Sequence, residues 1–270
     1  QPNAMGGREV GGLANMLAAH MDIENPIHRE RVQRFWQSPQ MCSKAGLKAV
    51  DLFDAMAEGK IKFVWIMATN PVMSMPNRNR VEAALRQCEM VVVSDIVAKN
   101  DTLAFADVIL PATGWSEKNG TVTNSERRIS RQRGMLAAPG DAKHDWQALC
   151  EVAQKLGFDH GFNYTHPADI FREHAALTAI ENENERALNL GGFATISQQD
   201  YDRLAPTQWP VLTHSSNNAP ASRLFADGQF YTADHKARFI AITPVPPQQL
   251  TTDAFPFVLN TGRSRDQWHT

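Results

Sequence analysis

Three short apolar segments, separated by helical patterns, constrain the fold of this chain more than any other feature. Residues 61–67, 90–93 and 107–110 are rich in β-branched and large apolar side chains, as in strands that are buried on both faces. Apolar residues at helical spacing separate them, over about 79–88 and again at 103–105. Parallel strands need a crossover between them, so this order predicts an α/β fold with a parallel, doubly wound sheet.

The flanking segments give further helices. One is predicted before the sheet, ending at Gly59, and another after it over 144–157. Residues 120–133 alternate as extended structure does. Later in the chain the signals weaken, but Thr165 can cap a helix through Phe171, and Ser197 begins a capping-box pattern.

Composition excludes several classes of protein. The 270 residues are 43% hydrophobic and 21% charged, with a formal net charge of −2. A balanced charge argues against nucleic acid as a partner, because displacing counterions from phosphate needs a basic surface. No apolar run approaches the roughly 20 residues of a membrane span, so no membrane insertion is expected. The three cysteines are widely spaced and fit a reducing, cytoplasmic compartment without a metal site.

Polar side chains follow each predicted strand. Asn70 comes after the first, Ser94 and Asp95 after the second, and Lys118 lies in the loop after the third. Parallel sheets bind ligands at the carboxyl ends of their strands, so this edge is a candidate ligand site. Alternatively, Asn70 and Asp95 only cap the helices that follow. The first strand is followed by ATNP instead of GxGxxG, and no P-loop is present.

Three other segments stand out. Residues 6–12 contain four glycines and predict a tight loop in which the backbone approaches a neighbour closely, with Arg8 as an anion contact or an internal ion-pair partner. The acidic run of Glu181, Glu183 and Glu185 fits a solvated helix face. A basic run either faces an anionic ligand or lies on a solvated strand; it comprises Arg127, Arg128, Arg131 and Arg133.

Six blocks, taken in order, resemble the bis-molybdopterin-guanine-dinucleotide oxidoreductases, and in particular the prokaryotic assimilatory nitrate reductases. The blocks are QPNAMGGREVGGLA (1–14), ATNP (68–71), VVVSD (91–95), ADVILPATGWSEKNGTVTNSERR (106–128), KHDW (143–146) and LNTGRSRDQWHT (259–270).

This resemblance implies how the chain is organised. Residues 1–43 would be an N-terminal loop and helical segment of the molybdopterin oxidoreductase domain, and 44–160 its α/β cofactor-binding domain. Residues 161–250 would be a helical and irregular connector, and 251–270 the start of a truncated C-terminal β-barrel. The chain would thus be a fragment, because the iron–sulfur cysteine motif and the molybdenum-ligating cysteine of such enzymes are not in it.

The resemblance also implies a cofactor and its contacts. The cofactor is bis-molybdopterin guanine dinucleotide with molybdenum, and a [4Fe-4S] cluster belongs to the parent protein outside this fragment. Asn70, Ser94, Asp95, Lys118 and Asp145 match cofactor contacts, although Asp145 can also cap the helix that begins there. In the last block the matching residues are Thr261, Gly262, Arg263, Ser264, Trp268, His269 and Thr270.

The implied activity is reduction of nitrate to nitrite by oxygen-atom transfer, with an electron-donor protein or domain as partner. The isolated fragment is expected to be inactive, and Arg8 is the single candidate for guiding the anionic substrate. The alternatives are a formate dehydrogenase or periplasmic nitrate reductase relative, or a non-catalytic nucleotide-binding module.

Overall fold

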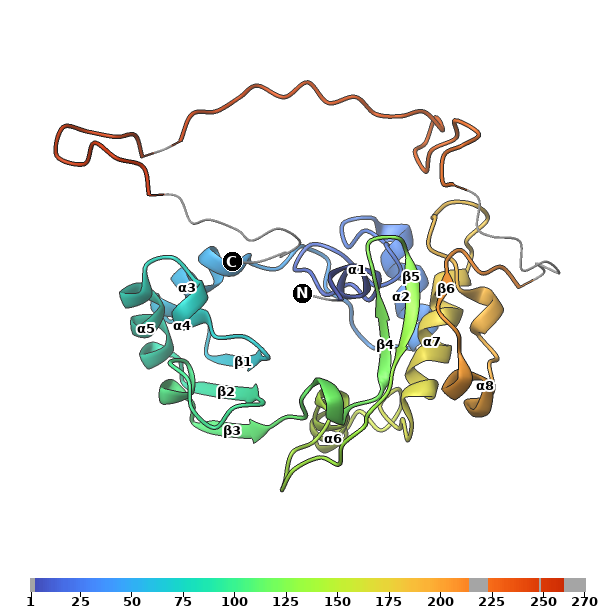
Figure 1. The fold of residues 1–270 in the computed structure, drawn as a ribbon, viewed down its shortest axis with the longest axis horizontal. Helices are drawn as coiled ribbons and strands as arrows, with labels where there is room; N and C mark the ends of the chain where they lie inside the picture. The colour runs from blue at the N-terminus through green and yellow to red at the C-terminus, as the bar shows by residue number, and fades with distance from the viewer. Residues whose placement is uncertain (1–2, 214–222, 248, 260–270) are drawn as a thin grey trace.

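The structure is a computed structural model, and it describes residues 3–213, 223–247 and 249–259. Figure 1 shows a parallel sheet with its helices on one side of the molecule and a second group of helices with an antiparallel hairpin on the other. A long segment without regular structure, residues 223–247 and 249–259, runs outside both groups.

The predicted parallel sheet is confirmed. It contains β1 (Phe63–Met67), β2 (Met90–Asp95) and β3 (Val108–Pro111), in the order β1-β2-β3 with both pairings parallel. Met67 pairs with Ser94, and Ser94 with Leu110, so the three strands end at nearly the same level. The polar residues that follow the strands are therefore brought to one edge.

Helices cover one face of this sheet. Ile66, Val91 and Val93 point to that face and pack with Met56 and Leu85 of the helices. On the opposite face Val92 is buried, whereas Phe63 and Met90 are about half exposed. The second covering layer of a doubly wound sheet is thus not seen within the described residues. The covering elements are α3 (Ala49–Ala57), α4 (Pro71–Ser74), α5 (Arg78–Gln87) and η1 (Leu103–Phe105).

The extended structure predicted at 120–133 is an antiparallel hairpin. Strands β4 (Gly120–Thr123) and β5 (Arg128–Gln132) pair with each other, and β5 also pairs with β6 (Thr207–Gln208). Ile129 packs into a second core with Phe171, Tyr201 and Trp209. The helices that contribute to this core are α1 (Ala4–Glu9), α7 (Pro167–Ala179), η3 (Gly191–Phe193) and α8 (Gln198–Arg203), whereas α6 (Asp145–Lys155) lies outside it.

Two helix starts test the predicted caps. Ser197 caps α8 as predicted, since its hydroxyl oxygen accepts from the Asp200 N–H at 3.0 Å. The prediction for Thr165 is wrong: His166 caps α7, with Nδ1 accepting from Ala168 N–H at 3.2 Å, and the helix runs on to residue 179. Thr165 instead donates to the Asp169 carboxylate from its backbone N–H and its hydroxyl.

The glycine-rich start is partly helical, which corrects the predicted loop. Helix α1 includes Gly6, where a Cβ would lie 2.1 Å from Asn3 Oδ1. The loop begins after it, and Gly11 has φ +75° with its backbone packed against Leu17 and Ala18. The predicted close approach of the backbone to its neighbours is therefore confirmed. It occurs partly in α1 and partly in the loop that follows.

The acidic run is exposed, as predicted, but it does not lie on a helix. It lies in turns after α7, and Glu181 and Glu185 both pair with the buried Arg31 of α2 (Pro26–Trp36), at 3.0 and 2.7 Å. Glu185 also contacts His28 at 3.1 Å. These pairs join α2 to the end of α7, so the charges serve packing between distant segments.

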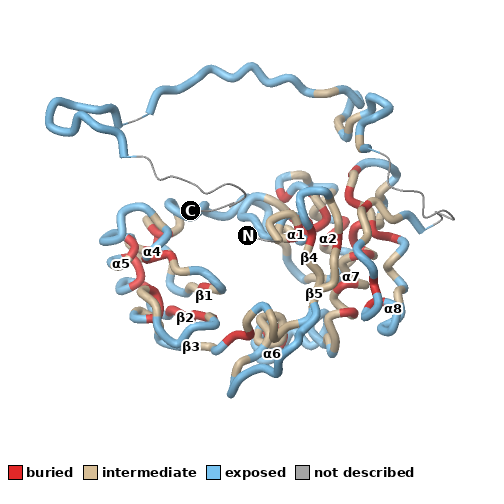
Figure 2. The backbone as a smooth tube through the Cα atoms, in the orientation of Figure 1, coloured by how far each residue is buried: buried red, intermediate tan, exposed pale blue. Residues whose placement is uncertain are grey.

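The segment 223–259 is largely exposed (Figure 2), and its apolar side chains include Phe239, Phe257 and Leu259, which are about nine-tenths exposed. No β-strand is assigned in the described part of 251–270, so the predicted start of a β-barrel is not confirmed.

Candidate functional site at the carboxyl edge of the parallel sheet

The carboxyl ends of β1, β2 and β3 are held level by backbone hydrogen bonds beyond the strands. The Ala68 N–H donates to Ser94 O, and the Ala112 N–H donates to Asp95 O, each at 3.0 Å. In Figure 1 the three arrowheads point the same way, toward the side where α6 lies. The sequence-predicted residues Asn70, Ser94 and Asp95 thus meet at one edge.

Asp95 organises the loop after β2. Its Oδ1 accepts from the backbone N–H of Ile96 at 2.7 Å, and its Oδ2 accepts from Asn100 Nδ2 at 2.8 Å. Asn100 Oδ1 in turn accepts from the N–H of Leu103, the first residue of η1, at 2.8 Å. Asp95 therefore stabilises the turn that directly follows it and does not cap the next helix. Its half-buried carboxylate keeps lone pairs that can accept from a further donor.

Ser94 is buried at the sheet edge. Only 3% of its surface is exposed, and its Oγ accepts from Trp65 Nε1 at 2.7 Å across the face that lacks helices. This bond anchors the indole over the sheet.

Asn70 does not cap α4. Its side chain makes no cap hydrogen bond, although the helix begins directly after it at Pro71. Its Oδ1 instead accepts from the hydroxyl of Thr102 at 2.6 Å. The capping alternative is thus wrong for Asn70, whose half-buried amide remains at the sheet edge.

The loop after β3 pairs with the segment before α6. Lys143 N–H donates to Pro111 O at 3.0 Å, and Thr113 N–H donates to Lys143 O at 3.1 Å. Thr113 Oγ1 also lies 2.9 Å from His144 Nδ1. These contacts bring the N-terminus of α6 to the sheet edge, although it is far away in the sequence.

Lys118 and Asp145, both predicted site residues, face each other there. The Lys118 Nζ lies 3.3 Å from Asp145 Oδ2, with 28% and 31% of their side chains exposed. Asp145 lies inside the first turn of α6, after the N-cap His144, so it is not the capping residue. Burial lowers the pKa of His144, and the nearby Lys118 ammonium lowers it further.

Two buried polar atoms at this helix start have no partner among the described residues: Asp145 Oδ1 and Trp146 Nε1. Buried polar atoms without partners are costly, and a bound ligand is one way to satisfy them. The edge thus offers a carboxylate acceptor, an ammonium and an indole donor close together. That set can hold a ligand with both an anionic group and N–H donors.

Arg8 lies apart from these contacts. It is exposed in the last turn of α1 and makes no ion pair with any described residue. Its neighbour Glu9 is 3% exposed and accepts from Thr123 Oγ1 at 2.8 Å and from Trp209 Nε1 at 2.7 Å. Glu9 therefore does not pair with Arg8, which corrects the internal ion-pair alternative with that residue.

The basic run was predicted either to face an anionic ligand or to lie on a solvated strand. Neither is correct for Arg131. The Arg131 side chain is 2% exposed, stacks on the Tyr201 ring at 4.0 Å, and donates to Tyr201 O at 3.0 Å. Arg127 lies 5.4 Å from the ring of Trp209. These arginines hold the hairpin to the later segments.

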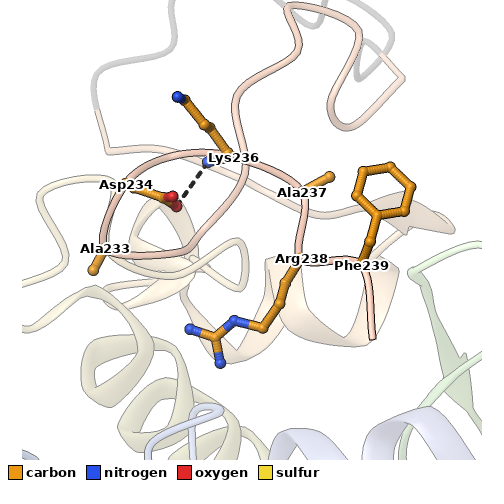
Figure 3. A pocket seen from close by; sticks show the side chains of 6 residues that line it. All are labelled: Ala233, Asp234, Lys236, Ala237, Arg238 and Phe239. Atoms are coloured by element: carbon orange, nitrogen blue, oxygen red, sulfur yellow. Dashed lines mark hydrogen bonds between the residues drawn. The ribbon is translucent and has the colours of Figure 1, made fainter. Parts of the chain in front are cut away.

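Several features lie outside this edge. The sequence-predicted contacts between 261 and 270 fall outside the described residues. A shallow hollow at 233–239 is lined by one turn, whose Lys236 and Arg238 side chains point in different directions (Figure 3). Within the described ranges there is neither a His, Cys, Asp and Glu group able to hold a metal nor a helix that could span a membrane.

Sequence reasoning missed Thr102, Asn100, Thr113 and Trp65. A local signal was available for Asn100, because Asn side chains often accept hydrogen bonds from backbone N–H groups a few residues later. Nothing local indicates that Thr102 meets Asn70, 32 residues earlier.

Residues 4–155 match the model of the molybdopterin oxidoreductase family. The chain belongs to this family, as the resemblance of its motifs indicated.

Among curated relatives, the chain is 49% identical to a nitrate reductase of Klebsiella oxytoca and 51% identical to one of Shewanella frigidimarina. Both alignments cover all of this chain but only 30% and 29% of the relatives. It is also 35% identical to the assimilatory nitrate reductase catalytic subunit of Bacillus subtilis, covering 37% of it. The chain thus spans about a third of the length of these relatives.

Two further similarities are more distant. An F420-dependent formate dehydrogenase subunit alpha of Methanocaldococcus jannaschii is 30% identical over the full chain, which covers 37% of it. Acetylene hydratase from Pelobacter acetylenicus is a structural neighbour with a TM-score of 0.53 and 17% identity, over 77% of this chain and 26% of that one. This neighbour supports the fold alone.

Proposed function

We propose that the carboxyl edge of β1, β2 and β3, together with the start of α6, holds a guanine dinucleotide of the molybdenum cofactor in a nitrate reductase. The observation that carries this proposal is Asp145 Oδ1, which is buried beside Lys118 and has no partner among the residues that the structure describes. The edge of a guanine base offers N–H donors that a carboxylate accepts, and an ammonium suits the pyrophosphate. The donor set of the edge thus supports a guanine dinucleotide form of the molybdopterin cofactor that the family name implies.

The residues have separate roles in this proposal. Asp145 and Asp95 accept from base or ribose donors, Lys118 neutralises phosphate charge, and Asn70 contributes its amide. Ser94, being buried, supports the site through Trp65. We propose further contacts from the residues at 261–264 and 268–270.

The molybdenum–pterin group, when bound, supplies the oxygen-atom transfer that converts nitrate, two electrons and two protons into nitrite and water. The protein binds, orients and shields it. We assign no acid or base in this chain and retain Arg8 as the candidate that attracts nitrate. The [4Fe-4S] cluster and the electron donor are proposed to lie outside the chain, and a cytoplasmic location fits its three free cysteines.

The specific substrate is proposed from relatives of about 50% identity that are named nitrate reductases. A formate dehydrogenase is the second candidate, because such enzymes also match the full chain at 30% identity.

We expect the purified whole protein to reduce nitrate with a reduced dye as electron donor, and not to reduce an oxidised dye with formate. Nitrite formation and dye bleaching measure the two reactions. A protein grown with tungstate in place of molybdate is the control, and it should lose the nitrate activity. Formate-dependent dye reduction without nitrite formation would favour the second candidate.

A further inference from the structure

We propose that Thr102 is a positioning residue that turns the Asn70 amide so that its Nδ2 donates outward at the sheet edge. Thr102 is 0% exposed and lies in the connection between β2 and β3. This inference rests on the proposed function, and it adds which atom of the Asn70 side chain faces the ligand.

The hydrogen bonds of Thr102 fix which atom of Asn70 faces it. The hydroxyl oxygen accepts from the Val72 N–H at 3.3 Å, and its proton goes to Asn70 Oδ1 at 2.6 Å. If the Asn70 amide were flipped, Nδ2 would point to the hydroxyl as a second donor. The buried hydroxyl proton would then lose this acceptor, which is costly.

The amide nitrogen is consequently the free end of Asn70. Its Nδ2 has no hydrogen bond to a described residue, and the side chain does not cap α4. Asn70 precedes Pro71, which disfavours helical backbone at Asn70 itself, and its φ of −121° is extended. The ligand atom that it meets is therefore an acceptor, such as a phosphate or carbonyl oxygen, and not a donor.

The central test replaces Asn70 by Asp in the whole protein. N70D keeps the oxygen that accepts from Thr102 and exchanges the outward donor for an oxygen, with almost no change in shape. We expect guanine nucleotide to be lost from the purified N70D protein at least about fivefold faster than from wild type, the value for one hydrogen bond. Its melting temperature without cofactor should stay close to that of wild type.

T102V and T102S test the positioning role. T102V should speed the loss of guanine nucleotide about fivefold in the wild-type background and have no further effect in the N70D background. T102S keeps the hydroxyl and should restore slow loss. Equal acceleration by T102V in both backgrounds would overturn the inference, because Thr102 would then act through folding alone.

Different results would contradict the role of Asn70 and the proposed cofactor site. Unchanged nucleotide loss in N70D, with faster loss on replacing Asp145, would overturn the Asn70 role and leave the edge site in place. Unchanged loss in both proteins would contradict the proposed function as well. If T102V does not fold, N70D against wild type still decides whether Asn70 donates.

Discussion

Replacing Asp145 with alanine is expected to remove most of the cofactor from the whole protein. The carboxylate begins α6 beside Lys118, and one of its oxygens is buried without a partner among the described residues. A charge-assisted hydrogen bond contributes about 1.5–3 kcal/mol, so the dissociation constant should rise roughly 10- to 100-fold. Guanine and molybdenum content per polypeptide measures the loss.

Glu151 provides a matched control for Asp145. It is a carboxylate on the same helix, and it also pairs with a lysine, Lys143, at 2.7 Å. That pair is more than half exposed, however, and Glu151 lies beyond the first turn of α6, whereas Asp145 lies within it. Glu151→Ala should therefore keep wild-type cofactor content, and equal losses in the two variants would remove Asp145 from the site.

Replacing Glu9 with alanine should loosen the hairpin on the other side of the molecule. Thr123 and Trp209, each 3% exposed, both donate to its carboxylate. Without it, two buried donors lose their acceptor, at a cost of about 2–4 kcal/mol. Amide hydrogen exchange of residues 120–132 should accelerate at least about 30-fold.

The control for Glu9 is Glu24→Ala, which removes an exposed carboxylate of the same part of the chain. It should leave exchange in the hairpin unchanged. Glu9→Gln keeps one acceptor and should give an intermediate rate. Identical exchange in the Glu9→Ala and Glu24→Ala proteins would show that this carboxylate does not hold the hairpin.

Sequence periodicity predicted the elements whose signals are local. The three strands and the cap at Ser197 follow from neighbouring residues, and the strands alone bring Asn70 and Asp95 to one edge. The resemblance of motifs added Asp145, which no pattern of the sheet indicates. The packing of the start of α6 against the end of β3 depends on contacts at Lys143 and Thr113 that only the fold reveals.

Apart from the caps at Thr165 and Asn70, the wrong predictions concern charges and glycines whose partners are distant in sequence. Arg131 meets Tyr201, and Arg31 meets Glu181 and Glu185, at separations of 70 to more than 150 residues. A charge run appears solvated in sequence when its partners lie that far away. The helix at Gly6 likewise depends on Asn3, whose Oδ1 accepts from the Thr123 N–H at 2.9 Å.

Hydrogen exchange of the whole protein, compared with and without cofactor, tests the edge site most directly. Protein from a host that cannot make the cofactor provides the empty form. We predict that bound cofactor slows exchange in residues 94–102, 112–118 and 143–147, and leaves the turns at 181–186 unchanged. Unchanged exchange in all three edge segments, with slowing confined to other parts of the protein, would contradict the account.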